Sequence, residues 1–423
     1  MVYALILIFF LLVFIGVPVA FSLGTTGFIF FIIEGMPLSV VAQRLFSTTQ
    51  SFSFLAVPFF ILAGNLMIKS GIAKKVINIS LEIVGKLPGG LGLVSIITSM
   101  IMAGVSGSSV ADASAVGSVL IPAMKEQGYS SSFSASINAT SSVVGIIIPP
   151  SSTMIIIAWI TELSVAKMFM AGVIPGFLFG LIYFIITIFI SNKRDYPKGK
   201  KFDFKRTLIS IREGIWAILL PLFILGPIIL GIATATEVSS IAVVLSIFIG
   251  AFIYKELGFK GFWITLKDSV YATSVIMIIL TSASIFSWMI IYEGVPDTIT
   301  NILLGFGLGY NGLLLVLILV LIIAGTVLQL VPNLFVTLPI VYPIMLDIGM
   351  DPIHSAILIL CSLALGLFTP PIGSTLFISC HLAQVNVEDT VFDLVPYFVG
   401  GLIVVLIIAF FPQISVGFAD MII

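Results

Sequence analysis

Charged residues are scarce in this sequence. Only 9% of its 423 residues are Asp, Glu, Lys or Arg, whereas 60% are hydrophobic, and the mean hydropathy is +1.28. Soluble domains contain about 25% charged residues. The composition therefore excludes a soluble domain and predicts an all-α polytopic membrane protein.

Cysteine and nucleotide-binding patterns are equally scarce. Cys361 and Cys380 stand 19 residues apart at opposite ends of one predicted helix, so they cannot form a disulfide, and two thiols make no metal site. The chain has no Gly-x4-Gly-Lys-Ser/Thr loop, and its 18 basic residues are mostly confined to loops. We expect no nucleic-acid partner and no cofactor other than a coupling ion.

Proline and glycine recur at a constant spacing in the two halves. The residues Pro122, Gly128, Gly145, Pro149, Pro150 and Pro175 are each followed 221 positions later by the same residue, at Pro343, Gly349, Gly366, Pro370, Pro371 and Pro396. An alignment without gaps indicates an internal duplication. Hydrophobic segments interrupted at matching positions of two repeats are typical of secondary transporters.

A length of about 20 residues per membrane crossing divides the chain into about ten spans. They are 2–18, 20–35, 51–68, 131–160, 168–190, 215–232, 237–255, 268–292, 354–381 and 393–415. Two further segments, 91–124 and 312–345, have a polar middle and are predicted to be re-entrant hairpins. The segments 72–86 and 294–304 are of mixed polarity and suit helices at the membrane surface.

Each half then crosses the membrane five times, so the second repeat is inverted relative to the first. The first repeat covers 1–190, a basic cytoplasmic linker covers 191–212, and the second repeat covers 213–423. With a periplasmic N-terminus, 16 of the 18 basic residues face the cytoplasm, and only Arg44 and Lys167 face outward. This distribution obeys the positive-inside rule.

The interrupted segments carry the candidate binding groups. Paired prolines remove backbone donors and break the helices 131–160 and 354–381, which leaves carbonyl groups unpaired. Such carbonyls and nearby hydroxyls suit a dehydrated Na⁺, while the N-termini of half-helices suit an anion. The predicted Na⁺ ligands are Ser106, Ser108, Gly145, Ile148, Pro150, Gly325, Gln329, Gly366, Thr369 and Pro371. The predicted substrate-binding residues are Asp112, Asn138, Ser152, Thr153, Asn333, Ser374 and Thr375.

Structural roles compete with these assignments. A single serine in a membrane helix often only permits close helix packing. Asp112 lies near a predicted hairpin tip, and its counterpart in the second repeat is Asn333. An acid inside the membrane is a functional candidate, but this pairing also suits hydrogen bonding of the tip. Glu237 begins a predicted helix, where a carboxylate stabilises the helix dipole.

Five motifs resemble the large membrane subunit of tripartite ATP-independent periplasmic (TRAP) transporters. They are Gly104-Val-Ser-Gly-Ser-Ser-Val-Ala-Asp112, Gly145-Ile-Ile-Ile-Pro-Pro-Ser151, Ala171-Gly-Val-Ile-Pro-Gly176, Thr234-Ala-Thr-Glu237 and Gly366-Leu-Phe-Thr-Pro-Pro-Ile-Gly373. One departure stands after Gly325, where the family often has an Asp and this chain has Thr326.

The resemblance implies more than the residues themselves establish. It implies the elevator fold of the ion-transporter superfamily, with a moving transport domain formed by 91–160 and 312–381 and a scaffold formed by the remainder. It implies a multi-pass protein of the bacterial inner membrane with two partners, a small four-helix membrane subunit and a periplasmic solute-binding protein. A Na⁺ gradient would drive uptake of an organic acid such as sialic acid or a C4-dicarboxylate.

Three other readings stay open. A stand-alone Na⁺/organic-anion symporter would transport without a binding protein, and a passive channel would have little use for duplicated, interrupted helices. Gly104-Val-Ser106-Gly107 also matches the Gly-x-Ser-Gly pattern of rhomboid-type intramembrane proteases. That chemistry needs a histidine near the serine, and His354 and His381 are predicted at the membrane interfaces of the other half. We therefore expect no enzyme activity.

Overall fold

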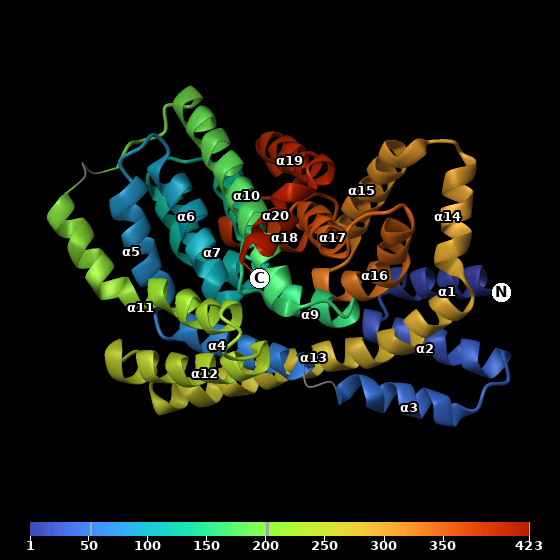
Figure 1. Cartoon of the computed structure of the whole chain (residues 1–423). Coiled ribbons are helices and arrows are strands. Elements are labelled where there is room, and N and C mark those ends of the chain that lie inside the picture. The colour runs from blue at the N-terminus through green and yellow to red at the C-terminus, as the bar shows by residue number, and fades with distance from the viewer. Residues whose placement is uncertain (51–52, 200–202, 423) are drawn as a thin grey trace.

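A computed structural model describes residues 1–50, 53–199 and 203–422. Within these ranges the chain is helical and contains no β-strand (Figure 1). The helices of the first half are α1 (Val2–Phe14), α2 (Val19–Ile33), α3 (Leu38–Thr49), α4 (Ala56–Lys69), α5 (Ile72–Val84), α6 (Gly90–Ser106), α7 (Ser109–Glu126), α8 (Ser131–Val144), α9 (Ser152–Ile160) and α10 (Val165–Lys193). Those of the second half are α11 (Phe204–Ile229), α12 (Ala235–Phe248), α13 (Phe259–Tyr292), α14 (Val295–Gly305), α15 (Gly309–Val327), α16 (Leu330–Asp347), α17 (Pro352–Gly366), α18 (Ser374–Ala383), α19 (Val387–Phe410) and α20 (Val416–Ile422).

Many of these helices begin where the sequence supplies a capping side chain. Ser108, Ser130 and Ser151 each accept a hydrogen bond from a backbone N–H in the first turn of α7, α8 and α9. Thr234 and Glu237 form a capping box at the start of α12. Glu237 therefore has the structural role expected of a first-turn acid, because it satisfies a backbone donor that the helix leaves free.

The helices confirm a polytopic membrane protein. In the described ranges, seven helices are long and apolar enough to cross a membrane, and the pair α4 and α5, bent by 66°, raises the number to as many as eight. The seven include α15 and α16, the two arms of the predicted second hairpin. The shorter apolar helices include α1, α2, α6, α17 and α18.

The two halves have the same order of elements in the same register. α7 spans 109–126 and α16 spans 330–347, so both ends differ by 221 residues. By the same offset, α6, α8, α9 and α10 correspond to α15, α17, α18 and α19, and α5 corresponds to α14. One difference is clear: α3 and α4 are two helices, whereas their counterpart is the single 34-residue helix α13.

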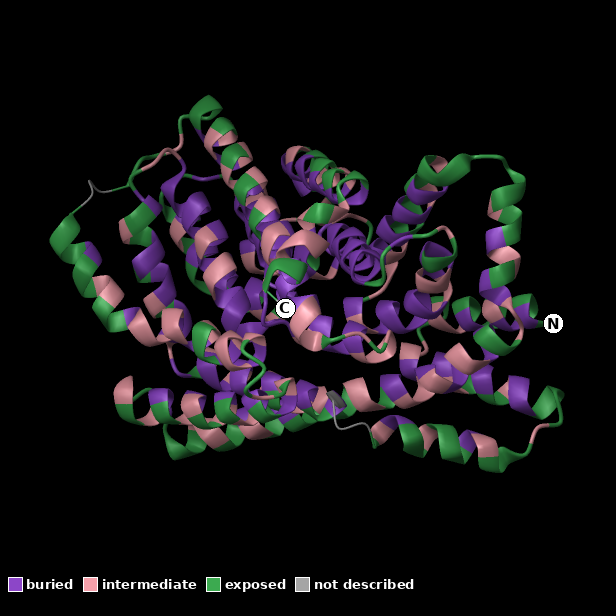
Figure 2. Ribbon diagram, in the orientation of Figure 1, coloured by how far each residue is buried: buried purple, intermediate pink, exposed green. Residues whose placement is uncertain are grey.

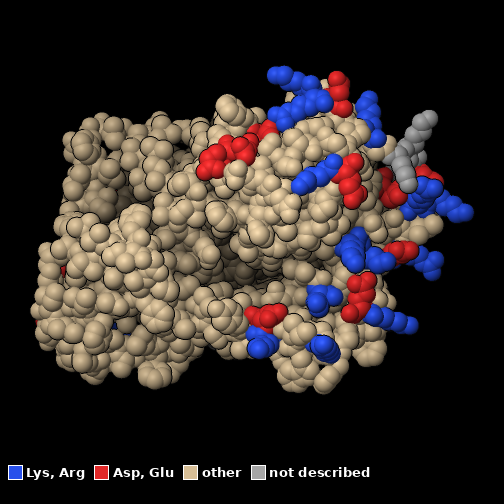
Figure 3. All heavy atoms as spheres, turned by 180° about the vertical axis from the view of Figure 1, so that it is seen from behind, with Lys and Arg blue, Asp and Glu red and all other residues tan. Residues whose placement is uncertain are grey.

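The orientation of the repeats is visible in the two short helices α5 and α14. In Figure 1 the long helix α13 runs across the molecule, and α5 and α14 stand across its direction at opposite ends. Lys and Arg side chains gather at the end that carries α5, and the opposite end shows few charges (Figure 3). Equivalent short helices at opposite ends are the arrangement that an inverted duplication produces.

The most deeply buried helices lie at the centre of the molecule. Almost every residue of α8 and α17 is buried, including the polar residues Ser134, Asn138 and Ser362 (Figure 2). The outer helices α11, α12 and α13 instead expose large apolar side chains such as Phe223 and Trp263. Because water is absent from a bilayer core, an apolar exterior around a polar-containing centre suits a protein that is surrounded by lipid.

The structure corrects the bounds of several predicted elements. Residues 204–212, predicted as part of the linker 191–212, form the first turns of α11, because Asp203 caps that helix. Helix α3 was not predicted, and α13 begins at Phe259 rather than 268. The predicted span 51–68 begins at residues outside the described ranges, and 200–202 of the linker are also outside them.

Candidate functional site

The first candidate site begins at the tip of the α6–α7 hairpin. Helix α6 ends at Ser106, the next residue Gly107 has a φ of 56°, and Ser108 caps α7. Glycine suits this position because a positive φ is costly for other residues. A β-carbon on Gly107 would also lie 3.0 Å from the backbone nitrogen of Ser152, so the tip packs tightly on the start of α9.

Asp112 is fully buried behind this tip. Its Oδ1 atom accepts a hydrogen bond of 2.6 Å from the Ser106 hydroxyl, and its Oδ2 atom has no hydrogen-bond partner. A β-carbon added to Gly145 would lie 2.3 Å from Oδ2, so the free oxygen faces the break between α8 and α9. One carboxylate oxygen therefore stabilises the hairpin tip through Ser106, and the other is free to bind a ligand at the helix break.

The break between α8 and α9 supplies unpaired backbone oxygens. In the part of the chain that the structure describes, the carbonyl groups of residues 145–150 accept no hydrogen bond. The Ser152 hydroxyl donates to the carbonyl oxygen of Gly107 at 3.1 Å, which ties the break to the hairpin tip. Carbonyl, hydroxyl and carboxylate oxygens thus come together at one place, as a hard cation requires.

The second half repeats this arrangement. The chain turns between α15 and α16 at Leu328 and Gln329, and the Gly373 N–H donates to the carbonyl oxygen of Thr326 at 3.4 Å. A β-carbon on Gly366 would lie 2.3 Å from the carbonyl carbon of Gly325, so the two backbones approach as only glycine permits. Carbonyls 368–372 accept no hydrogen bond from a described residue. The Pro149–Pro150 and Pro370–Pro371 peptide bonds are both cis.

The second site differs from the first in charge. Asn333 occupies the position of Asp112 and is likewise fully buried, and neither its amide nitrogen nor its amide oxygen has a hydrogen-bond partner. A buried amide without partners is unusual, because its desolvation is not compensated. The residue therefore offers both a donor and an acceptor to the space around it, but no negative charge.

Helices from the two halves are joined beside these sites. The Asn138 side chain in α8 donates to the Ser379 hydroxyl in α18 at 2.8 Å and to the Ala113 carbonyl oxygen in α7 at 3.0 Å. Lys125 at the end of α7 donates to the carbonyl oxygen of Ala383 at the end of α18. The first hairpin and the second broken helix are thereby fixed to each other.

The predicted site residues fall into three groups. Close to a hairpin tip or a helix break with free oxygens lie Ser106, Ser108, Asp112, Gly145, Ile148, Pro150, Ser152, Gly325, Asn333, Gly366 and Pro371. Of the others, Asn138 donates to Ser379 although its amide oxygen has no partner, and the hydroxyls of Thr369 and Thr375 donate to the carbonyl oxygens of Leu365 and Leu367. Gln329 is exposed at the second tip, and Thr153 and Ser374 begin the half-helices α9 and α18. Ligand roles for all of them stay predictions.

The geometry around Ser106 bears on the protease alternative. Its hydroxyl donates to Asp112, while Nδ1 of His354 lies 2.7 Å from the hydroxyl oxygen of Ser415 and His381 lines a separate pocket with Asp389. Neither ring therefore serves as a base for Ser106. In the described ranges no three His, Cys, Asp or Glu side chains are grouped as a metal site would need.

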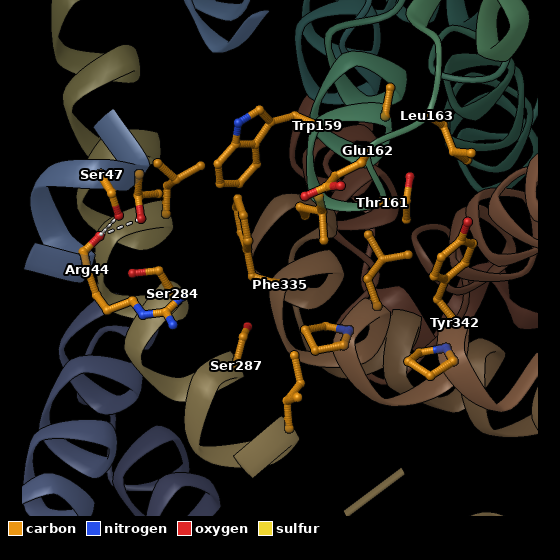
Figure 4. A pocket seen from close by; sticks show the side chains of 18 of the residues that line it. Arg44, Ser47, Trp159, Thr161, Glu162, Leu163, Ser284, Ser287, Phe335 and Tyr342 are labelled. Atoms are coloured by element: carbon orange, nitrogen blue, oxygen red, sulfur yellow. Dashed lines mark hydrogen bonds between the residues drawn. The ribbon is translucent and has the colours of Figure 1, made fainter. Parts of the chain in front are cut away.

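A large cavity was not foreseen from the sequence. It has a volume of about 850 Å³ and lies between α3 and α13 on one side and α9 and α16 on the other (Figure 4). Arg44, Ser284, Trp159, Phe335 and Tyr342 are among its lining residues, and none of the predicted ligands is. The one signal in the sequence was an isolated arginine in the short segment 38–49, which no span or hairpin had included.

The chain is similar to known transporter proteins over most of its length. Residues 6–414 match the family model of the DctM component of the tripartite ATP-independent periplasmic transporters. The isethionate TRAP transporter permease protein DctMQ of Oleidesulfovibrio alaskensis is 34% identical over 96% of this chain and 64% of its own length. The C4-dicarboxylate TRAP transporter large permease protein DctM of Pseudomonas aeruginosa is 34% identical over 94% of this chain and 93% of its own length.

A solved structure shares the fold at low sequence identity. The Alcanivorax borkumensis YdaH transporter aligns with a TM-score of 0.62 over 90% of this chain and 89% of that chain, with 12% identical residues. Such a likeness extends to the arrangement of the helices and not to the chemistry of the site.

Proposed function

Because the chain belongs to the DctM component family of tripartite ATP-independent periplasmic transporters, we propose that it is the large subunit through which a Na⁺ gradient drives uptake of an organic acid. The observation that carries this proposal is the repeated contact between a hairpin tip and a broken helix. In each half the contact gathers free backbone oxygens, at 145–150 and at 368–372. Duplicated broken helices of this kind form the ion and substrate sites of secondary transporters.

Sodium is the ion whose chemistry these groups fit. Na⁺ is a hard cation, and the first site offers carbonyl oxygens, the Ser106 hydroxyl and the free Oδ2 of Asp112. A carboxylate near the ion offsets its charge in a region without water. The second site has Asn333 in place of the acid, so we propose that it holds its ion more weakly.

The substrate is proposed to be a small organic acid. The relatives from Oleidesulfovibrio and Pseudomonas bear the names of isethionate and C4-dicarboxylate transporters, and these substrates are small organic anions. The resemblance adds sialic acid to this class. Half-helices α9 and α18 begin at the two breaks, and their N-termini carry the partial positive charge that attracts an anion.

We propose an elevator motion for the transport step. Helices α6–α9 and α15–α18 form the moving unit, and the Asn138–Ser379 hydrogen bond joins its two halves. At one point the scaffold approaches this unit closely over a glycine: a β-carbon on Gly64 of α4 would lie 3.1 Å from the Ser106 carbonyl oxygen. A close backbone contact without side chains suits two bodies that slide past each other.

The partners and the location follow from the same proposal. The protein lies in the bacterial inner membrane with its N-terminus in the periplasm, supported by the basic residues at the opposite end of the molecule (Figure 3). It pairs with a small four-helix membrane subunit and receives substrate from a periplasmic binding protein. The greater length of the isethionate relative, of which this chain spans 64%, agrees with a second subunit.

Uptake into proteoliposomes tests the function. The chain is reconstituted with its small subunit and binding protein, and radiolabelled succinate, isethionate and N-acetylneuraminate are offered with Na⁺ or choline outside. We expect at least one acid to accumulate only with an inward Na⁺ gradient and only with the binding protein. Uptake by the chain alone would indicate the stand-alone symporter, and accumulation of no acid would contradict the proposal.

Thermal unfolding in detergent tests the ion site separately. A ligand at 100 times its dissociation constant stabilises a protein by about 2.7 kcal/mol. We expect the unfolding temperature to be higher in NaCl than in KCl or choline chloride, and the difference to disappear in Ser106→Ala. Equal unfolding temperatures in the three salts would remove the first Na⁺ site as proposed.

A further inference from the structure

Arg44 is a solitary cation at the edge of the large cavity between α3 and α13 on one side and α9 and α16 on the other. Among the described residues it forms no ion pair, and its guanidinium carbon lies 5.9 Å from the ring centroid of Trp288. In Figure 4 the guanidinium points toward Ser284 and Ser287 of α13. Five N–H donors in a fixed plane are thus held by an aromatic ring and left free of any carboxylate.

The position of this cation in the whole molecule is exceptional. Nearly all other basic side chains gather at the opposite end (Figure 3). Lys167, the other basic residue predicted to face outward, lies 3.7 Å from the Asp420 carboxylate and does not line the cavity. An unpaired positive charge beside a cavity with low-dielectric walls raises the local concentration of anions.

The other walls of the cavity suit a small organic acid. Ser287 lies on the side of Arg44, and Trp159 and Phe335 provide apolar surface opposite (Figure 4). The hydroxyls of Ser47 and Ser284 on the same side already donate to the carbonyl oxygens of Arg44 and Thr281, so the donors for an anion come mainly from the arginine. A volume of about 850 Å³ falls within the range of ordinary ligand pockets, about 300–1,000 Å³. A carboxylate or sulfonate can accept two parallel hydrogen bonds from a guanidinium, while its carbon skeleton contacts the aromatic side chains.

One acid also lines the cavity. Glu162 follows the end of α9, on the wall opposite Arg44, and it is not within ion-pair distance of the arginine. Its φ of 56° is rare for a residue other than glycine, and it lies in the turn between α9 and α10. The Glu162 carboxylate repels an anionic ligand, whereas the Arg44 guanidinium attracts it.

We propose that this cavity is a reception site for the organic anion, with Arg44 as its carboxylate- or sulfonate-binding residue. The proposal rests on the proposed function for the identity of the anion. The site is distinct from the hairpin sites, because none of the residues predicted to bind Na⁺ or substrate lines it. It lies between helices α3 and α13 of the proposed scaffold and helices α9 and α16 of the proposed moving unit. An anion arriving from outside would therefore contact the scaffold and the moving unit at the same time.

The test measures the electrostatic field in the cavity with two charged thiol reagents, so it does not depend on transport. Cys361 and Cys380 are replaced by alanine, and Ser287→Cys introduces one reactive thiol on the cavity wall. The probes are sulfonatoethyl and trimethylammonioethyl methanethiosulfonate. Both react in the same way, because the thiolate forms a mixed disulfide with the alkylthio group and methanesulfinate leaves, but the groups they transfer differ in charge. The ratio of their labelling rates, anionic over cationic, reports the field at the site independently of the natural substrate.

Three further substitutions in this background make the measurement specific. We expect Arg44→Gln to lower the ratio about tenfold, and Glu162→Gln to raise it. Lys167→Gln removes a charge on the same predicted face but outside the cavity, and it should leave the ratio within about twofold, since screening weakens a distant exposed charge. An unchanged ratio in Arg44→Gln would overturn the proposal. Unfolding temperatures of each variant establish that it is folded.

Protection of the introduced thiol by unlabelled acids then identifies the occupant. In a neutral, lipid-free detergent, succinate, isethionate or N-acetylneuraminate should slow labelling of the Ser287→Cys protein when Arg44 is present and not in Arg44→Gln. A phospholipid headgroup offers the same anionic chemistry, so the experiment is repeated in phosphatidylcholine and phosphatidylglycerol nanodiscs. The reception site is overturned if phosphatidylglycerol alone slows the labelling, or if none of the acids that the wild-type protein transports slows it. The proposed transport function is then unaffected.

The opposite result separates the two proposals. If an acid slows the labelling but the protein takes up no acid, the transport function alone is contradicted.

Discussion

Asn138 and Ser379 are 241 residues apart in sequence and are joined by a buried hydrogen bond of 2.8 Å. The first belongs to the broken helix of one repeat and the second to the broken helix of the other. Asn138 also holds the Ala113 carbonyl oxygen of the first hairpin. One side chain thus connects three elements that we propose to move as a unit.

Removal of this connection should loosen the unit. We expect Asn138→Ala to lower the free energy of unfolding in mixed dodecylsulfate micelles by about 1–3 kcal/mol, because the substitution removes two buried hydrogen bonds from a dry interior. A double-mutant cycle with Ser379→Ala should give a coupling of about 0.6 kcal/mol, the average for such bonds in membranes, and at most about 1.7 kcal/mol. The control Ser118→Ala removes an exposed hydroxyl of α7 and should leave the free energy of unfolding nearly unchanged. A coupling near zero between Asn138→Ala and Ser379→Ala would contradict the role of the pair.

A methyl group at residue 145 should disturb the first ion site. The β-carbon of Gly145→Ala would lie 2.3 Å from Oδ2 of Asp112, so the carboxylate must move away from the break. We expect the stabilisation by NaCl over KCl to disappear while the protein remains folded. Gly226→Ala is the matched control, because nothing lies within 4 Å of that β-carbon. A normal sodium effect in Gly145→Ala would place the ion elsewhere.

The two prolines of the first break should be required for transport. In Pro149→Ala/Pro150→Ala both positions regain an N–H donor, so a helix can continue from α8 into α9 and use the carbonyls that are now free. We expect Na⁺-driven uptake to fall to background while the amount of purified protein is maintained. A double variant with normal uptake would show that the break is dispensable.

The charged contact between the ends of α10 and α19 should stabilise the fold. Arg194 pairs with Asp393, whose other carboxylate oxygen accepts from Ser132 at 2.6 Å and whose side chain is only 5% exposed. Arg194→Ala leaves this carboxylate short of a partner and should cost about 1.5–3 kcal/mol of stability. Arg206 pairs with Asp203 in an exposed position three residues away, so Arg206→Ala should cost less than about 1 kcal/mol. Equal losses in the two variants would contradict this difference.

The bounds of the broken elements could be read from the chain because glycine, serine and proline have local effects. The structure divides α6 from α7 at Gly107 and Ser108, and α8 from α9 across 145–151, where residues with special backbone requirements occur. These effects act over a few residues, so a sequence shows them directly. The division into a transport domain and a scaffold depends on relative motion and stays a prediction.

Side-chain partners could not be predicted in the same way. The substrate role of Thr375 stays a prediction, but no local pattern indicated that its hydroxyl donates to the Leu367 carbonyl oxygen, a contact that requires the chain to fold back across the break. Arg44 was placed outside the membrane and given no role, because no local pattern connects it to Glu162 or to Ser287. Only the packing of α3 and α13 against α9 and α16 creates the cavity that these residues share.

The sequence by itself determined that this is a duplicated membrane protein with interrupted helices. Composition is a property of the whole chain, and the 221-residue repeat of prolines and glycines needs no knowledge of contacts. The tertiary structure decided which interrupted segments meet, which carbonyls stay free, and where a solitary arginine faces a cavity. Those features arise from contacts between residues hundreds of positions apart, such as Asn138 with Ser379, and a local pattern carries no information on them.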